Sequence, residues 1–442
     1  MPDLLPSGAD APPAISLGQA SRLWLKVGLL SFGGAAGQIA LMHRFVVDER
    51  RWLDERAFLN ALNFVTLLPG PEAQQLATYM GWRLHGVRGG LVAGLFFVLP
   101  GALVMLALSL FYAAGRGSPL VEGIFLGIKA AVLAIIVEAV QRIARRAMKT
   151  RVLVTIAALA FAALLALPVP FPLVVVAAGL FGLAASREHP GWFGFTGDEA
   201  PAPPARPAGG AFAAAGAALI LWWLPVGAAA LALGSGHILV EIGLLFSKLA
   251  VVTFGGAYAV LAYLTDVAVQ RAWVTPGEMV DGLGLAETTP GPTILVNQFV
   301  GFLAAFRAPA PFPPYVAATL GALITVWVTF APSFLWIFVG GPYLERIVAN
   351  RRLAGALAAV TAAVVGVIAT LAVRFAVSVL FASSGTARLG PVSLPWPDWT
   401  SLRWDAALLA ALAAVILFRL HWGVVRAVAI GAAAGLALTL AR

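Results

Sequence analysis

Long apolar runs separated by short polar stretches dominate the chain, and they do not alternate between apolar and polar positions. Such runs are typical of membrane helices and not of a β-barrel, whose strands alternate. At about 20 residues per span, they predict roughly 10 to 14 membrane helices. We therefore expect an all-α polytopic membrane protein. The predicted apolar segments are residues 17–42, 57–69, 72–81, 89–114, 119–141, 152–167, 171–185, 211–234, 237–256, 276–306, 314–339, 353–381 (as two or more spans), 405–420 and 423–440.

Polar stretches divide the chain into four parts. Residues 1–16 hold four prolines and lack the basic start and apolar run of a signal peptide, so we expect a disordered N-terminal tail. Residues 187–209 include a polar, Pro-rich run with nothing to bury, which predicts a cytoplasmic linker. This linker separates a first membrane domain, 17–186, from a second, 210–442. A short amphipathic or loop region with Trp396, Trp399 and Trp404 is expected at the membrane interface.

The second half of the chain repeats motifs of the first in the same order. Lys26, Ser31-Phe32-Gly33-Gly34, Trp52 and Leu68-Pro69-Gly70-Pro71 are followed by Lys248, Thr253-Phe254-Gly255-Gly256, Trp273 and Thr289-Pro290-Gly291-Pro292. The offset is 222 at the first motifs (26 to 248, 32 to 254) and 221 at the later ones (52 to 273, 69 to 290). Chance does not easily reproduce this order and spacing, so we interpret the chain as two homologous halves.

Basic residues are distributed unequally between matching loops. The loop after the first motif contains four arginines (Arg44, Arg50, Arg51 and Arg56), whereas its counterpart, 265–278, contains only Arg271. The bias then reverses, because 142–151 holds five basic residues and the matching region holds only Arg374. Since basic loops mark the cytoplasmic side, equivalent loops would lie on opposite sides of the membrane. This predicts an inverted repeat, as in many secondary transporters, with a parallel repeat as the alternative.

Composition supports an integral membrane protein and narrows its chemistry. The 442 residues are 61% hydrophobic and 11% charged, against about 25% charged in a soluble domain. The chain has no cysteine, which excludes disulfides and thiolate metal sites, and its five histidines lie at no metal-ligand spacing. The net charge of +9 is explained mainly by basic cytoplasmic loops, with a minority of cations left to face an anionic substrate. No nucleophile triad, P-loop or dinucleotide fingerprint is present, so we expect no enzyme, no cofactor and no nucleic-acid partner.

The two Pro-Gly-Pro triplets are the first candidates for a binding site. Each should break a helix, and the helix that restarts offers free N–H groups and its positive dipole end. Two such ends meeting near the bilayer midplane would form an anion site, while a simple turn between two helices is the structural alternative. Polar residues that flank the breaks would either bind an oxyanion or cap the helix ends. They are Asn60, Asn63, Thr66, Glu72, Gln74, Gln75 and Thr78 in the first half, and Asp281, Glu287, Thr288, Thr289, Thr293, Asn297 and Gln298 in the second.

Two lysines are the best candidate cations, because each lies five residues before the hydroxyl residue of its motif. Lys248 is deep in an apolar run, whereas Lys26 follows Arg22 closely and could simply reach the headgroups from a helix end. Lys129 and Glu138 lie nine residues apart in one span, as either a pathway pair or a structural pair.

With these motifs, and with Leu99-Pro100 and Ala331-Pro332-Ser333, the sequence resembles the long, two-domain type of the chromate ion transporter (CHR) family over about 17–380. The resemblance implies export of chromate across the bacterial inner membrane, with resistance as the outcome, and sulfate as a related substrate or inhibitor. The second half has Ser333 where the first has Gly101, and Glu72 would stand awkwardly beside a dianion. A homodimer is a further expectation. Substrate-binding residues expected on these grounds are Lys26, Ser31, Gly33, Gly34, Pro69, Gly70, Pro71, Gln74, Gln75, Lys248, Thr253, Gly255, Gly256, Thr289, Pro290, Gly291, Pro292 and Asn297.

Three functional hypotheses follow. The first is a transporter of chromate or a sulfate-like oxyanion, and the second is a transporter of an unrelated substrate on the same scaffold. The third is a membrane scaffold for partner proteins, which would be expected to carry large soluble domains, whereas this chain has only a linker of about 20 residues.

Overall fold

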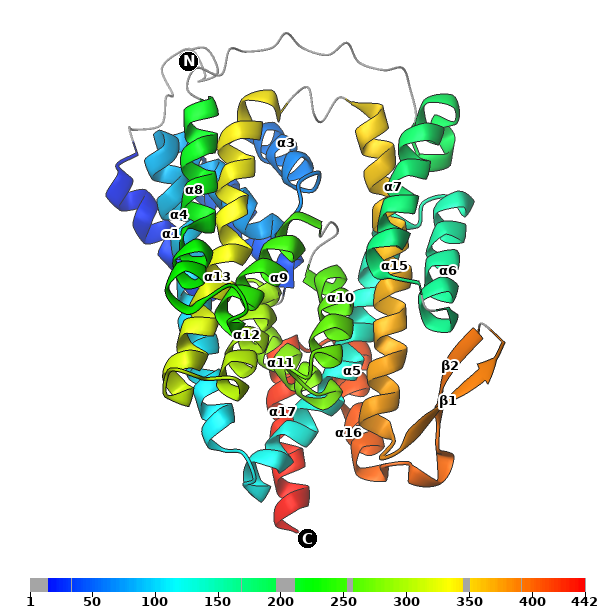
Figure 1. Ribbon diagram of the computed structural model, residues 1–442. Helices are drawn as coiled ribbons and strands as arrows, with labels where there is room; N and C mark the ends of the chain where they lie inside the picture. The colour runs from blue at the N-terminus through cyan, green and yellow to red at the C-terminus, as the bar shows by residue number, and fades with distance from the viewer. Residues whose placement is uncertain are drawn as a thin grey trace.

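Helices make up almost all of the computed structural model, which describes residues 15–32, 34–167, 169–195, 211–252, 257–344, 350–390 and 392–441 (Figure 1). The first half contains α1 (Leu17–Leu30), α2 (Gly34–His43), η1 (Arg44–Glu49), α3 (Glu55–Val65), α4 (Glu72–Ala114), α5 (Pro119–Ala147), α6 (Arg151–Ala166), α7 (Phe171–Glu188) and η2 (Pro190–Phe193). The second half contains α8 (Ala211–Leu233), α9 (Ile238–Val252), α10 (Ala257–Gln270), α11 (Pro276–Thr288), η3 (Thr293–Leu295), α12 (Val296–Arg307), α13 (Pro314–Gly340), η4 (Gly341–Tyr343), α15 (Arg351–Leu380), β1 (Ser384–Leu389), β2 (Val392–Pro397), η5 (Trp399–Ser401), α16 (Trp404–Ala414), η6 (Val415–Arg419) and α17 (Val424–Leu440).

Six helices among the described residues are long and apolar enough to cross a membrane. They are Glu72–Ala114, Pro119–Ala147, Phe171–Glu188, Ala215–Leu233, Pro314–Tyr343 and Arg351–Leu380. The prediction of a helical, multi-pass membrane protein is therefore confirmed. The predicted tail lies outside the described residues up to position 14, and the predicted linker lies outside them from 196 to 209.

Two sequence predictions need correction in the second half. The segment 353–381 forms one 30-residue helix, α15, and not two or more spans. At 1.5 Å per residue this helix is about 45 Å long, which matches one crossing of a bilayer with its headgroups. The region around Trp396 is not all loop or helix, because β1 and β2 form an antiparallel hairpin in which Ser384 pairs with Pro397 and Leu389 with Val392. Trp396 and Trp399 are exposed there.

Side chains at the starts of the short helices explain where the chain enters them. Ser16 caps α1 by accepting a hydrogen bond from the Gln19 N–H. Asp54 caps α3, and Thr275, which lies 221 residues later, caps α11 in the same way. An N-cap oxygen satisfies an N–H group that the helix itself cannot bond. The two halves therefore begin corresponding helices with corresponding caps.

The long helix α4 is two helices joined at a kink. His85 and Gly86 leave the helical conformation there, and Gly86 has a φ of 62°, which suits glycine. Gly81 lies against Gly89, so the arms on either side of the kink pack closely. In the second half, α12 and α13 pack in the same manner, with Gly301 against Gly321. The kinked α4 thus corresponds to the α12–α13 pair.

The two halves exchange their last helices. In the first half α6 and α7 pack against α15 of the second, while α16 and α17 of the second pack against α5 of the first. Gly123 and Gly127 of α5 meet Gly435 and Gly431 of α17 backbone to backbone. Small residues spaced by four let membrane helices approach this closely. Each half therefore packs its last helices against a helix of the other half.

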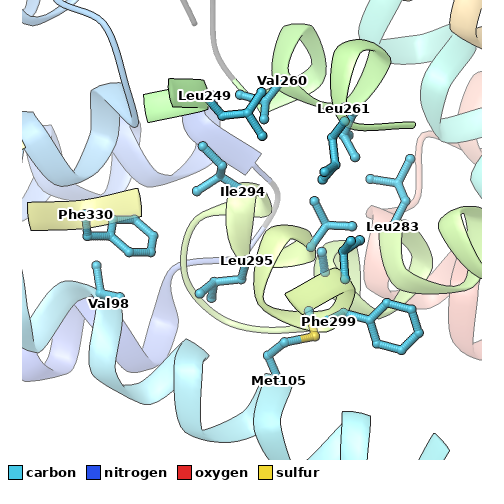
Figure 2. Packing of buried hydrophobic residues seen from close by; sticks show 14 of the residues in the cluster. Val98, Met105, Leu249, Val260, Leu261, Leu283, Ile294, Leu295, Phe299 and Phe330 are labelled. Carbon is cyan, nitrogen blue, oxygen red and sulfur yellow. The ribbon is translucent and has the colours of Figure 1, made fainter. Parts of the chain in front are cut away.

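The centre of the molecule is an apolar layer built from both halves. Figure 2 shows Ile294 and Leu295 of η3 between Val98 of α4, Leu249 of α9 and Phe330 of α13, all of which are buried. The second Pro-Gly-Pro turn, directly before η3, is buried as well. Polar groups beside the turn must consequently find partners within the protein or in a ligand.

Candidate functional site

The helix break after α1 lies directly against the second Pro-Gly-Pro turn. Ser31 is fully buried, its hydroxyl donates to the Val27 carbonyl at 2.5 Å, and its own carbonyl accepts the Gly291 N–H at 2.8 Å. Gly34, which starts α2 with a φ of 71°, approaches Thr293 so closely that a Cβ there would lie 3.8 Å from the Thr293 hydroxyl oxygen. The first motif of one half is thereby bonded to the broken helix of the other.

A buried glutamine completes the second turn. Gln38 of α2 donates its side-chain amide to the Gly291 carbonyl at 2.6 Å. Gly291 has a φ of 98°, a conformation that glycine adopts without strain. Thr289, just before Pro290, donates its hydroxyl to the Leu285 carbonyl of α11. Sequence reasoning passed over Gln38, because it lies four residues beyond the Gly-Gly pair with no polar counterpart at Val260.

The first Pro-Gly-Pro turn meets the second half in the mirrored arrangement. Gly70 has a φ of 111°, and a Cβ there would lie 3.5 Å from the Ser333 hydroxyl of α13 and 3.9 Å from the Ala250 carbonyl of α9. Gln75 donates its amide to the Pro69 carbonyl at 2.6 Å and lies 3.5 Å from the Ser333 hydroxyl. The turn between Pro69 and Pro71 is thus held by the other half, as the second turn is.

Helix residues Gly101 and Ser333 explain why the halves differ at this position. Gly101 of α4 lies against the second turn, and any Cβ on it would overlap the Pro290 carbonyl oxygen. Its counterpart on α13, Ser333, has room for a hydroxyl that faces Gln75. The difference seen in the sequence therefore follows from a closer contact at the second turn.

Four side-chain amides are buried just after the two turns, and each keeps an oxygen without a hydrogen-bond partner among the described residues. They are Gln74, Gln75, Asn297 and Gln298. Gln298 donates to the Ala102 carbonyl at 2.9 Å and Gln75 to the Pro69 carbonyl, so their amide orientations are fixed by chemistry. Unpaired buried acceptors are costly, and they indicate a site that receives water or a ligand.

The two repeated lysines are not brought to the turns. Lys26 is exposed with its ammonium 4.6 Å from the centre of the Phe45 ring. Lys248 is exposed as well, and its ammonium donates to the Tyr263 hydroxyl at 3.1 Å. Each lysine therefore contacts an aromatic ring from the segment after its break, and no contact with either Pro-Gly-Pro turn is recorded for the described residues. Of the other expected site residues, Gly33, Thr253, Gly255 and Gly256 lie outside the described part of the chain.

Ionic contacts between the halves form a second polar region. Lys129 of α5 does not pair with Glu138, which binds Arg142 at 2.6 Å. Its ammonium lies 3.2 Å from the Asp281 carboxylate of α11. Sequence spacing could not find this pair, because it joins helices that are 152 positions apart (129 to 281). No group of three His, Cys, Asp or Glu side chains that could hold a metal ion occurs in the described ranges.

Comparison with known proteins agrees with this architecture. The sequence model described as Chromate transporter matches residues 18–183 and 240–436, one segment in each half. The chromate transport protein of Pseudomonas aeruginosa is 35% identical over 369 residues, which are 83% of this chain and 82% of that protein. The chromate transport protein of Cupriavidus metallidurans is 28% identical over 375 residues, 83% of this chain and 84% of the relative. No solved structure matches significantly. On two matched segments and relatives aligned over most of their length, this chain belongs to the chromate transporter family.

Proposed function

We propose that this protein is a secondary transporter that exports chromate from the cytoplasm across the bacterial inner membrane and so confers chromate resistance. Family membership and the names of the relatives support chromate as the substrate. The observation that supports the mechanism is that each Pro-Gly-Pro turn contacts the opposite half of the chain. Gly291 is bonded to Ser31 of the first half, and Gly70 packs against Ser333 of the second.

The substrate in this proposal binds where the broken helices restart. The N–H groups at the starts of α4 and η3 have no carbonyl four residues earlier in their own helix, and they carry the positive end of the helix dipole. Such helix ends favour tetrahedral oxyanions. The unpaired side-chain oxygens of Gln74, Gln75 and Asn297 accept hydrogen bonds and cannot donate to an oxyanion, so in this proposal water bridges them to it. Lys26 and Lys248 supply positive charge along the approach.

Alternating access would arise from an inverted repeat, which we propose as the relation between the halves. The reversed bias of basic loops supports it, and Figure 1 gives further support, because α3 lies toward the upper end of the molecule whereas its counterpart α11 lies toward the lower end. In inverted-repeat transporters, rocking of one repeat against the other opens a central site to each side in turn. Each Pro-Gly-Pro turn contacts the opposite half, so rocking of one half against the other would act on both turns.

The membrane potential is sufficient to drive export. A potential contributes about 2.3 kcal/mol per charge per 100 mV. A dianion that leaves a cytoplasm held about 150 mV negative moves down the potential, and its free energy falls by about 7 kcal/mol. ATP is not needed in this account. Sulfate or another anion of the same shape and charge is the second candidate substrate for this scaffold.

Chromate uptake into everted membrane vesicles tests the proposal, because the cytoplasmic face of such vesicles is outside. We expect saturable uptake that sulfate inhibits and that slows when the potential is collapsed. A Gly291→Ala variant should lose uptake, since Gly291 has a positive φ and packs against Gly101. Gly390→Ala is the matched control, because Gly390 also has a positive φ but nothing within 4 Å of a Cβ. Uptake no higher than in vesicles without the protein would refute chromate export.

A Lys248→Ala variant separates the roles of charge and helix ends. Loss of uptake would support an approach role for the lysine. Full uptake would leave the function intact and confine binding to the turns.

A further inference from the structure

An ion pair between the halves is buried away from the two turns. Asp281 of α11 is 2% exposed, and one of its carboxylate oxygens lies 3.2 Å from the Lys129 ammonium and 2.9 Å from the Tyr112 hydroxyl. Its other oxygen is buried with no hydrogen-bond partner in the described part of the chain. The Lys129 side chain is 26% exposed and the Asp281 side chain 3%, so the lysine is the more accessible partner of the pair. Gly277 of α11 lies beside that ammonium, which would be 3.5 Å from a Cβ placed on the glycine.

The duplication supplies an internal control for the need for a carboxylate. The caps Asp54 and Thr275 align the two corresponding helices at an offset of 221 residues (54 to 275). At the same offset, Asp281 corresponds to Asn60 (60 to 281). The same helix has therefore been built with a neutral amide in one half and with an acid in the other. A charge at this position is not required by the helix itself, which points to a role in function.

The other charged groups around Asp281 are engaged with one another or exposed. Glu278, on the same helix, binds Arg116 at 2.7 Å and Arg307 at 2.7 Å. On the neighbouring α10 and α15, Asp266 and Arg374 bind each other at 2.5 Å. The arginine of α17, Arg426, is exposed. Tyr112 of α4, Lys129 of α5 and Glu278 are thus the titratable groups whose charge Asp281 feels most directly.

We propose that a transported oxyanion and the Asp281 carboxylate compete for the Lys129 ammonium, and that the displaced carboxylate takes up one proton. The ion pair plus a dianion and a proton becomes an ammonium–dianion pair plus a neutral carboxylic acid, and the net charge is −1 on both sides. Displaced from its cation in a buried position, an ionised carboxylate would be very costly, so protonation accompanies displacement. Asp281 and Lys129 together form a proton-linked anion site.

This inference rests on the proposed function and deepens it, because it couples movement of the anion to a proton. Asp281 is seven residues before the end of α11 at Thr288 (281 to 288), or about 10 Å along the helix at 1.5 Å per residue. The pair is therefore a separate step on the path of an anion that leaves the turns. Tyr112 keeps a hydrogen-bond partner in either protonation state of the acid.

Equilibrium binding to the purified full-length protein tests the proposal, with radiolabelled sulfate as the probe and chromate as a second probe. Sulfate remains a dianion over the range used, so any pH dependence belongs to the protein. Between about pH 6 and about pH 8, linkage to one proton weakens binding by up to about tenfold per pH unit. Asp281→Asn should remove this pH dependence. The variant should bind at every pH as tightly as the wild-type protein binds at low pH, because no carboxylate then competes with the anion for Lys129. Asp266→Asn, which alters an acid paired elsewhere, should bind like the wild-type protein.

The outcomes separate this inference from the function on which it rests. Binding by the wild-type protein that does not change with pH would overturn the inference and leave oxyanion transport standing, without recourse to any variant. Unchanged pH dependence in a folded Asp281→Asn protein would overturn it too. Failure of both oxyanions to bind folded wild-type protein at every pH would overturn the proposed function and the inference together.

Discussion

A single methyl group at Gly101 should disrupt the second turn. A Cβ at this position would overlap the Pro290 carbonyl oxygen and would lie 2.7 Å from a methyl carbon of Leu295. Carbon atoms pack best at about 3.5 Å or more, so the leucine contact alone requires a shift of about 0.8 Å. Overpacking of this kind typically costs about 1 to 3 kcal/mol. The turn that must move also carries the Gly291 bond to Ser31, so we expect Gly101→Ala to lower both stability and transport.

The assay combines two readouts on the same preparations. Thermal unfolding of the purified protein reports the cost in stability, and chromate uptake into everted vesicles reports the function. Gly227→Ala is the matched control, because Gly227 also lies in a membrane helix but has nothing within 4 Å of a Cβ. If Gly101→Ala has the same unfolding temperature and the same chromate uptake as Gly227→Ala, the close contact between α4 and the second turn is refuted.

Three further variants test other contacts. Gln38→Leu leaves the buried Gly291 carbonyl unpaired, which should cost about 1 to 3 kcal/mol, measured by thermal unfolding; a stability equal to that of the wild-type protein would remove Gln38 from the site. The hydrogen bond to Glu55 raises the pKa of His43 above its ordinary value of 6.5. The stabilisation that the His43–Glu55 contact gives the fold should therefore be complete below the ordinary pKa of 6.5 and lost as pH rises through the raised pKa. The difference in unfolding temperature between the wild-type protein and His43→Gln should close with rising pH, and a difference that widens would contradict this. Gly127→Val should prevent α17 from docking on α5, seen as loss of folded protein in detergent, and normal yield would refute that packing.

The repeated motifs predicted the breaks but not their partners. Ser31 and Gly291 each stand beside a break that the sequence indicates, because proline and glycine interrupt helices wherever they are placed. That Ser31 bonds to the turn of the opposite half depends on how two halves pack, and no local pattern encodes it. Gln38 was missed for the same reason, since its partner is 253 residues away.

Charge pairing was the least predictable feature from sequence. Lys129 and Glu138 share a helix, and nine residues on one helix are too far apart to pair directly, so Lys129 finds Asp281 on another helix instead. The prediction of two or more spans over 353–381 was also wrong. The apolar run that forms α15 contains no proline and is as long as one full crossing of a bilayer with its headgroups. By contrast, positions of most apolar helices followed directly from hydropathy, since every membrane span must satisfy its own backbone.

The most direct test of the central claim is to tie the crossed segments together and ask whether transport stops. The chain has no cysteine, so a Gly34→Cys, Thr293→Cys double variant would contain one possible disulfide. The Gly34 Cβ position lies 3.8 Å from the Thr293 hydroxyl oxygen, within reach of a disulfide. Gly34 has a φ of 71°, so Gly34→Cys alone should lower uptake into everted vesicles. We predict that the reduced double variant takes up chromate as the Gly34→Cys variant does, and that the oxidised double variant does not until it is reduced. Formation of the disulfide with uptake unchanged would contradict a transport site at the crossing of the two halves.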